Sequence, residues 1–550
     1  MDKRFDLDDG IIKFFYKPDK NYSDELENVD DKQQNEFERL STLELLNQAS
    51  EAAEKNDFQK AKQLWEIAAK YGNDHAEYCL ALCNLEGWDS EVNYNLAFRY
   101  FKKSAEKGNF RAEYYLAYCY EFGFGTEINS DLAFEWCQKS AEQDFVYAQY
   151  RLAHYYMLNQ NLPVAANKTL FWFNKAAEQD YIPAIHMLGI CYLNGIGDIK
   201  NFEKAIIFFQ KAAENRYYPS IYKLGECYEN GFGVIQDINK AIDFYQQASD
   251  GEYAEAQYKL AEFYENGKYL QQDFQKAVEL YKQSADNEYP PAQNAYGWCF
   301  VVGKIVKQNM YEAVRWFKRA AKQGNMRAQY NLAICYEEGK GVLQDVDKAF
   351  YWHKLAAEQG DDRAQLHLGW AYMVGNGVKI DGFESFKWLK LSAEQGNSQA
   401  YTDLGYCYAN SIGTKKDLQE AFNWYLKSAE LNNLMAIYNV GCCYRHGDGV
   451  KKDTIKAIEW YQKGADLGSV DCMVSLAFMY EYGKGIKKDL EKAIEFYKLA
   501  YQNGEQSAQF MLDRKKIKKF IKKNVKVWFQ IYYNSIFKLI WEQKCFRLYL

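Results

Sequence analysis

One pattern of apolar and polar positions returns every 36 residues along this chain, with no insertion or deletion between neighbouring units. Counted from a small first residue, the small or apolar positions are offsets 0, 4, 5 and 8, which share one face of an α-helix. Offset 4 is usually leucine, offset 5 is often alanine or glycine, and offset 8 is tyrosine in ten of twelve complete units. This pattern predicts a helix whose small residues allow a neighbouring helix to approach closely. The units begin at Ala76, Ala112, Ala148, Ala184, Ser220, Ala256, Ala292, Ala328, Ala364, Ala400, Ala436, Cys472 and Ala508.

A second helix is predicted in each unit. Glycine ends the first helix, at offset 11 in ten units and again at offset 13 in eight, and supplies the left-handed backbone that closes the last carbonyls. Offset 17 is Asp or Asn in eleven of twelve units, as an N-cap for the next helix. Offset 24 is a large apolar residue, which we expect in the core. In seven units it is tryptophan: Trp136, Trp172, Trp316, Trp352, Trp388, Trp424 and Trp460.

A fixed period of 20–50 residues predicts a solenoid, in which each unit contacts its neighbours and the core grows along one axis. This organisation accounts for 550 residues without several globular domains. We expect a flexible charged segment at 1–40, a degenerate capping repeat at 41–75, twelve complete repeats at 76–507, and a partial repeat or cap with a basic, aromatic tail at 508–550.

Strings such as YNLAICYEEGKGVLQDVDKAFYWHKLAAEQG (330–360) carry a family resemblance. The order small-x3-Leu-Gly/Ala-x2-Tyr, Gly-x-Gly-Val, Asp-x2-Lys-Ala and Ala-x2-Gly resembles the Sel-1-like repeat, a relative of the tetratricopeptide repeat. The resemblance covers about 41–512. It implies an all-α fold, a right-handed α-α superhelix of about thirteen two-helix repeats. It also implies roles in assembling signalling or membrane-associated complexes, among them adaptors of endoplasmic-reticulum-associated degradation and regulators of cell-wall synthesis.

Composition and charge narrow the class of partner. Apolar content (48%) and charged content (26%) are typical of a folded soluble protein, and the net charge is −7. Since the strongly basic segment 513–550 is confined to one end, the repeats themselves are acidic, which argues against a broad nucleic-acid interface. The chain starts without a basic and apolar leader, and no window reaches the length of a spanning helix. We therefore expect a cytoplasmic protein.

The cysteines recur at one offset and do not form a disulfide framework. Members of such a series lie a full repeat apart, too far for a bond between their Cα atoms. The pattern predicts free, buried thiols in a reducing compartment. Secreted bacterial relatives described as β-lactamase-like hold their helices with regular cysteine pairs, but Ala177, Ala213 and Ala321 stand at the partner position here, so a hydrolase of that kind is not supported. The series is Cys83, Cys119, Cys191, Cys227, Cys299, Cys335, Cys407 and Cys443.

Signals of catalysis are poor. The six histidines occupy different phases of the repeat, without an HExxH motif or a metal-ligand cluster. The loop glycines follow no strand and lack the GxxxxGK[ST] of a phosphate-binding loop. We therefore predict no catalytic residue, no cofactor, no metal and no small-molecule substrate, and instead a non-enzymatic adaptor or scaffold for protein partners.

The candidate binding surface comes from positions that are fixed in place but vary in residue. By resemblance to tetratricopeptide arrays, offsets 2, 6, 9 and 10 of the first helix would line a concave face. An acidic stretch beside exposed aromatics suits a partner segment with basic and apolar anchors. In the alternative interpretation, the tryptophans at offset 6 are partly buried against adjacent units. The candidates are Glu226, Glu229, Glu262, Glu265, Trp298, Val302, Trp370, Met373 and Tyr406.

The segment 513–550 leaves three alternatives open. Its lysines precede a run of aromatic residues, as in an interfacial anchor on acidic membranes, which would make the protein a membrane-tethered regulatory subunit. A second interpretation is a capping helix on the last repeat, and a third is translated non-coding sequence. Gln530, Asn534 and Lys538 interrupt the segment and argue against a true span.

Overall fold

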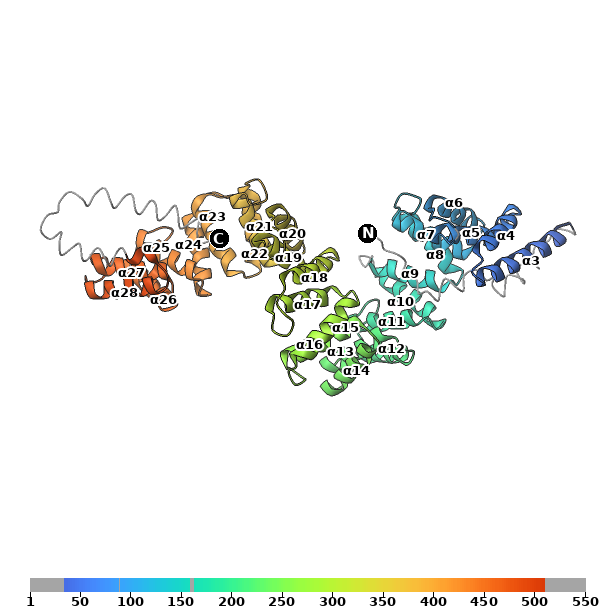
Figure 1. Ribbon diagram of the computed structural model, residues 1–550, viewed down its shortest axis with the longest axis horizontal. Coiled ribbons are helices and arrows are strands. Elements are labelled where there is room, and N and C mark those ends of the chain that lie inside the picture. Colours follow the sequence, from blue (N-terminus) through green and yellow to red (C-terminus); the bar gives the residue numbers. More distant parts are fainter. Residues whose placement is uncertain (1–33, 89, 159–162, 510–550) are drawn as a thin grey trace. The chain divides into compact units, whose positions relative to one another are not determined.

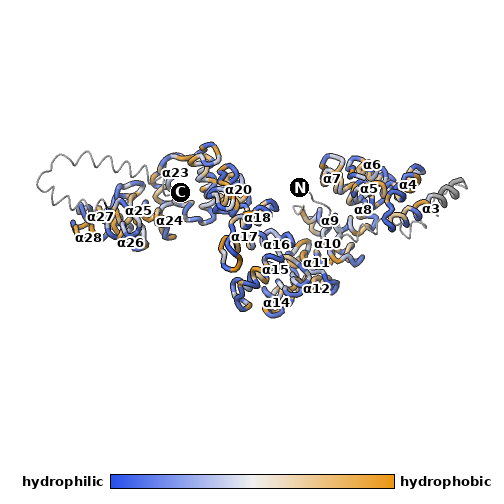
Figure 2. Tube along the Cα trace, in the orientation of Figure 1, coloured by the Kyte–Doolittle hydropathy of each residue, from blue (hydrophilic) through white to orange (hydrophobic). Residues whose placement is uncertain are grey.

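The computed structural model describes residues 34–88, 90–158 and 163–509, and in these residues the regular elements are helices, with no strand. The chain divides into two compact units, with the division between Asp273 and Phe274. Figure 1 labels the helices and colours them in the order of the sequence. The all-α repeat class that the sequence predicts is confirmed. Figure 2 shows hydrophobic and hydrophilic residues interleaved along most of the coloured helices, as expected where a helix buries one face.

The helices follow one another in pairs. In the first unit they are α3 (Gln34–Glu54), α4 (Phe58–Lys70), α5 (Asp74–Glu86), α6 (Tyr94–Ala105), α7 (Phe110–Phe122), α8 (Ser130–Glu142), α9 (Val146–Leu158), α10 (Pro163–Glu178), α11 (Ile182–Asn194), α12 (Phe202–Glu214), α13 (Tyr218–Asn230), α14 (Ile238–Asp250) and α15 (Ala254–Asn266). In the second unit they are α16 (Phe274–Asp286), α17 (Pro290–Val302), α18 (Met310–Lys322), α19 (Met326–Glu338), α20 (Val346–Glu358), α21 (Asp362–Val374), α22 (Gly382–Glu394), α23 (Ser398–Asn410), α24 (Leu418–Glu430), α25 (Leu434–His446), α26 (Thr454–Asp466), α27 (Val470–Tyr482) and α28 (Leu490–Gln502).

The ends of the helices are capped as the sequence predicts. At the start of α20, the Asp345 side chain accepts a hydrogen bond from the Lys348 amide, and the equivalent Asp or Asn does the same in other repeats. At the end of α19, Gly339 adopts a left-handed conformation with φ 68°, and its amide bonds to the Cys335 carbonyl. Ser411 is an exception, because it holds the same conformation with φ 60° without being glycine.

The second glycine of the loop is required by packing between repeats. A Cβ atom at Gly341 would overlap the carbonyl oxygen of Met310, the first residue of the second helix in the preceding repeat. The same clash would arise in the next repeats, at Gly377 with the Val346 carbonyl and at Gly413 with the Gly382 carbonyl. This glycine therefore lets each loop lie directly on the previous repeat.

The core is centred on offset 25 and not on the tryptophans of offset 24. Phe209, Tyr245 and Phe317 stand at offset 25 and are almost fully buried against the small residue at offset 5. The tryptophans pack against the core as predicted, but only Trp316 is buried, and the other six are half-buried at its edge. Several carry a cation over the ring, such as Lys139 at 3.8 Å from the Trp136 centroid, which covers the outer face of the indole.

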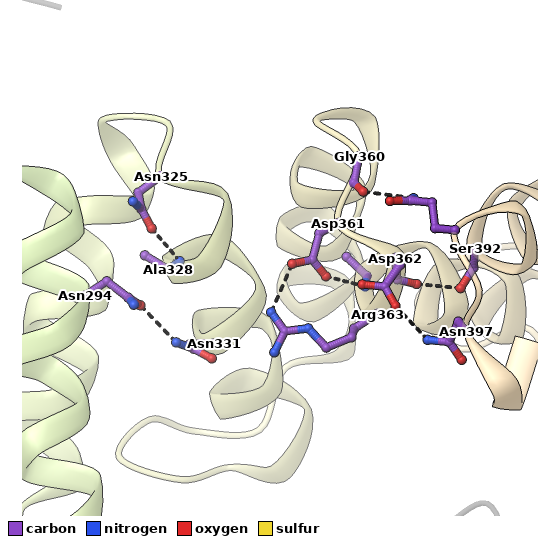
Figure 3. A network of polar contacts seen from close by, with 12 residues as sticks. Asn294, Asn325, Ala328, Asn331, Gly360, Asp361, Asp362, Arg363, Ser392 and Asn397 are labelled. Carbon is purple, nitrogen blue, oxygen red and sulfur yellow. Dashed lines mark hydrogen bonds and ion pairs between the residues drawn. The ribbon is translucent and has the colours of Figure 1, made fainter. Parts of the chain in front are cut away.

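Polar side chains join successive helices at equivalent places (Figure 3). The Asp362 carbonyl at the start of α21 accepts a hydrogen bond from Ser392 Oγ of α22 at 2.7 Å. Its carboxylate accepts another from Asn397 Nδ2, next to α23, at 2.9 Å. One residue thus ties its own repeat to the next. Ser104 and Asn109 bond in the same way to Asp74 in the first unit.

The predicted cysteine state agrees with the structure among the described residues. The cysteines at offset 7 are free thiols, and all but the half-buried Cys299 are buried. Burial raises the pKa of Cys119 to about 12, so this thiol stays protonated and unreactive at neutral pH. The predictions for 513–550 lie outside the described residues, as does most of 1–40.

Candidate functional site

The clearest part of the predicted surface lies on α17. Trp298 and Val302 are one helical turn apart and are 50% and 55% exposed. A side chain as large and apolar as tryptophan is normally mostly buried in a folded protein. Together with Ile305 in the following loop, which is 40% exposed, they place apolar surface at one end of the helix.

The equivalent positions on α21 and α23 are partly covered. Trp370 is half-buried and lines a small cavity, and Met373 is half-buried against the core around Leu389 and Leu404. Tyr406 on α23 is 38% exposed. The alternative interpretation of partial burial therefore describes Trp370 well and Trp298 poorly.

The acidic candidates of the first unit are partly neutralised. Glu226 is half-buried and pairs with Lys223 on the same helix, with Nζ and Oε2 2.6 Å apart. Glu262 on α15 is half-buried, and Glu265 on the same helix is exposed. Since the Lys223 ammonium adds a positive charge beside Glu226, this surface is less acidic than the sequence alone indicates.

Glu229 does not face solvent. Its side chain is 12% exposed, and its carboxylate lies 3.1 Å from Lys259 Nζ of α15. It also accepts a hydrogen bond from Tyr245 Oη of α14 at 2.6 Å. Burial, together with this bond to a carboxylate, raises the pKa of Tyr245. Glu229 thus joins two successive repeats and contributes little to an accessible surface.

The Glu229 arrangement is one case of a recurring contact. In this contact, a carboxylate at offset 9 of one repeat pairs with a side chain at offset 3 of the next repeat. The pair lies close to the residue at offset 25 of the first repeat. In the repeat that begins at Ala112, Glu121 pairs with Arg151 of α9 at 2.8 Å and also accepts a hydrogen bond from Tyr155. Burial by itself would lower the pKa of Arg151. The neighbouring Tyr114 and Glu121 raise this pKa by more, so it increases overall and the side chain stays charged.

In the repeat that begins at Ala328, histidine occupies offset 25, and a second histidine occupies offset 3 of the next repeat. Glu337 of α19 lies 3.3 Å from His353 Nε2 of α20 and 3.4 Å from His367 Nδ1 of α21. The two imidazoles stack with centroids 4.6 Å apart and planes 11° apart. We name these three residues the Glu–His–His cluster. Among the described residues, it is the group of side chains whose ligand atoms converge closely enough to hold a metal ion.

Sequence reasoning missed the Glu–His–His cluster because His353 and His367 are 14 positions apart and occupy different offsets. The interpretation of the histidines as scattered is therefore corrected for this pair. A signal was available in the repeat itself, since offset 25 is aromatic in most units and is histidine only at His353. His154 and His186 of the first unit stand apart from it in sequence, and burial lowers the pKa of each to about 4.

Comparison with known proteins agrees with this architecture. A family model described as Sel1 repeat matches thirteen segments: 44–73, 74–109, 111–145, 146–181, 182–217, 219–253, 254–289, 290–325, 327–361, 362–397, 398–433, 434–469 and 470–505. Comparison with curated proteins gives no match.

Two solved structures illustrate the similarity. A protective antigen present in uropathogenic Escherichia coli strains, displaying an SLR fold, is 27% identical with a TM-score of 0.49, covering 84% of this chain and 97% of that chain. A Sel1 repeat protein from Oxalobacter formigenes is 30% identical with a TM-score of 0.42, covering 44% of this chain and 96% of that chain. Every helix in the described part of the chain is too short or too polar to span a lipid bilayer.

Proposed function

Because this chain belongs to the Sel1 repeat family, we propose that it is a non-catalytic scaffold that binds protein partners on the variable face of its first helices. Proteins built from Sel1 and tetratricopeptide-like repeats generally mediate protein–protein interactions. The face is formed by offsets 6, 9 and 10, whose side chains differ from repeat to repeat, whereas offsets 0, 4 and 8 keep similar residues.

The observation that carries this proposal is the exposure of Trp298 and Val302. Large apolar side chains that share one exposed helix face commonly mark a binding surface, and tryptophan is enriched among residues that dominate binding energy. The partner that fits is a protein segment with large apolar side chains. Tyr406 extends the same type of surface to α23, and Trp370 and Met373 contribute the parts of their side chains that are not covered.

In the first unit, Glu226, Glu262 and Glu265 offer carboxylates at the corresponding offsets. They would select partners with basic side chains by attraction at the rim of an interface, which affects association rate more than affinity. Glu229 is left out of this surface because Tyr245 and Lys259 already bind its carboxylate.

The test is a quantitative comparison of captured partners. We would immobilise the wild-type chain, the variant Trp298→Ala/Val302→Ala, and the control variant Leu343→Ala, and measure bound proteins by mass spectrometry. Leu343 is 91% exposed in the loop that follows α19, so the control also removes exposed apolar surface. We expect partner recovery to fall by about tenfold or more only in the α17 variant, as for loss of a central hot spot.

Equal recovery of every partner by all three proteins would contradict the choice of surface. A thermal unfolding profile for each protein excludes misfolding as the cause of a loss. Since both α17 side chains are already half exposed, we expect the substitutions to change stability by less than about 1 kcal/mol.

Assembly of signalling or membrane-associated complexes is a narrower hypothesis, which the family resemblance motivates. The tether that this hypothesis invokes, 513–550, lies outside the described residues. Flotation of the full chain with acidic vesicles, compared with a chain that ends at Ala508, tests it directly, and equal flotation of the two proteins would reject the tether.

A further inference from the structure

We propose that the Glu–His–His cluster binds one divalent transition-metal ion, with zinc the first candidate, and that the ion ties two successive repeats together. The ligands are Glu337, His353 and His367. This inference concerns a different property from partner binding and does not depend on the proposed function.

The ligands come from three consecutive helices. Glu337 lies on α19 and His353 on α20, which form one repeat, whereas His367 lies on α21 in the next repeat. Their ligand atoms all lie within 4.8 Å of one another. An ion among them would therefore connect two repeats that are otherwise held by packing and hydrogen bonds.

Two of the three ligand spacings fit a small tetrahedral ion. Zinc binds histidine nitrogen and carboxylate oxygen at about 2.0–2.1 Å, and the edge of a tetrahedron with those bonds is about 3.3–3.4 Å. The two distances from the Glu337 carboxylate, to His353 Nε2 at 3.3 Å and to His367 Nδ1 at 3.4 Å, match this edge. Two imidazoles and one carboxylate favour zinc and its neighbours over magnesium or calcium, which prefer oxygen ligands.

The cluster has the enclosure that a site needs. It lines a cavity of about 10 Å³ with Trp370 and Asn376, which is the space of roughly one water-sized sphere. His353 is 5% exposed, so the cluster is largely shielded from solvent on this side.

Packing alone does not explain His353. Its position holds Phe101, Phe209 or Phe317 in other repeats, where an apolar ring fills the core. The imidazole instead leaves its Nδ1 buried without a hydrogen-bond partner, which is unfavourable compared with a ring of carbon atoms. The histidine also turns a ligand nitrogen, Nε2, toward Glu337, where those repeats place only ring carbon atoms.

The contact around the cluster also differs from its counterparts. Where Glu121 and Glu229 occupy offset 9, a permanently charged Arg151 or a Lys259 from the next repeat closes the contact. At Glu337 the cation is replaced by the imidazole of His367. The carboxylate then retains capacity for a positive ion.

Binding requires one adjustment. The ring nitrogens present their lone pairs in the ring plane, and planes only 11° apart cannot both point at one ion. His353 is held in the core, whereas the His367 side chain is 30% exposed on α21 and has room to rotate. We expect its ring to tilt toward the carboxylate, with water or another ligand completing the coordination.

The test uses the full chain. Wild type, His353→Phe and His367→Asn would be titrated with Zn²⁺ by calorimetry and with Co²⁺ by visible spectroscopy, where tetrahedral Co²⁺ absorbs strongly. Phenylalanine and asparagine occupy the same offsets in other repeats, as at Phe317 and Asn331, so both variants keep the repeat pattern. His446→Asn is the matched control, because it removes an exposed histidine of the second unit.

We expect one ion per chain in the wild type and in His446→Asn, and binding weaker by about 100-fold or more in each cluster variant. Zn²⁺ should also raise the unfolding temperature of the wild type and of His446→Asn, but not that of the two cluster variants. Equal uptake and equal Co²⁺ spectra in wild type and in His353→Phe would overturn the proposal, as would absence of uptake by a correctly folded wild type.

Discussion

Gln359 Nε2 donates a hydrogen bond to Gln329 Oε1 at 2.7 Å, and this pair links the end of α20 to the buried face of α19. Gln329 is 3% exposed, and its own Nε2 bonds to the Ala321 carbonyl of the preceding repeat at 3.2 Å. The contact recurs wherever glutamine stands at offsets 1 and 31: Gln149 with Gln179, Gln293 with Gln323, and Gln365 with Gln395. In the repeat where offset 1 is Ile437, offset 31 is Leu467, so both polar partners are absent there.

The first prediction concerns this glutamine pair. We expect Gln359→Leu to destabilise the α19–α21 region by about 1–2 kcal/mol, because the buried Gln329 carbonyl loses its donor. The double variant Gln329→Ile/Gln359→Leu reproduces the Ile437 and Leu467 combination and should recover most of the loss. Native-state hydrogen exchange in α19 and α20 measures both effects, and additive losses in the double variant would contradict a coupled pair.

The second prediction concerns pH. Glu113 occupies offset 1, where other repeats have glutamine, and Gln143 donates a hydrogen bond to it at 2.8 Å. Burial raises the pKa of Glu113 from 4.5 to about 7, although Lys139 opposes the change. Because the folded pKa lies above the unfolded pKa, the folded chain binds more protons between these values, and stability falls as pH rises toward 7.

Glu113→Gln removes this ionisation. We expect the variant to exceed the wild type in stability at pH 8 by about 1–2 kcal/mol, after allowance for solvent screening, and to match it near pH 4.5. Urea unfolding of both proteins across this pH range checks the difference. A stability difference that stays constant with pH would show that the substitution acts through packing instead.

The third prediction concerns the cap of α23. Ser411 holds φ 60°, a conformation that glycine adopts without a steric penalty and that ten other repeats fill with glycine. We expect Ser411→Gly to stabilise the chain by about 0.5–1 kcal/mol, as relief of left-handed strain exceeds the entropy of glycine in the unfolded chain. The control Asn410→Gly, in the last helical residue, should destabilise, and thermal unfolding distinguishes the two signs.

The fourth prediction separates backbone strain from steric overlap. Gly449 and Gly468 have φ of 71° and 92°, but only a Cβ at Gly449 would overlap another atom, the Leu418 carbonyl oxygen. We expect Gly468→Ala to cost about 1 kcal/mol and Gly449→Ala about 2–4 kcal/mol, since the second adds overlap between repeats to the strain. Equal losses in urea unfolding would show that overlap is relieved by small movements.

The sequence was sufficient for the helices because their signals are local. Leu332, Gly339 and Asp345 recur at fixed offsets, and each acts within a few residues of its own position by packing, terminating or capping a helix. The incomplete burial of the tryptophans has a physical cause. The residues at offsets 24 and 25 both lie near the buried face of the second helix. Only the close contact with the small residue at offset 5 shows that the residue at offset 25 is the fully enclosed one.

The candidate surface was predicted less completely. Trp298 and Val302 are exposed, as expected for residues at offsets 6 and 10. Glu229 stands at an offset where exposure was also expected, but its side chain is only 12% exposed. The difference depends on Lys259, which stands 30 positions away and reaches Glu229 only when two repeats are stacked.

By itself, the sequence determined the repeat length, the two-helix unit, the caps and the free thiols, because each follows from contacts inside one unit or from its exact repetition. Only the tertiary structure decided which variable side chains remain accessible and which meet across a repeat boundary. Glu337, His353 and His367 converge because offsets 9, 25 and 3 of successive repeats occupy one place in space. Such convergence depends on the stacking of whole repeats, and no single stretch of sequence contains it.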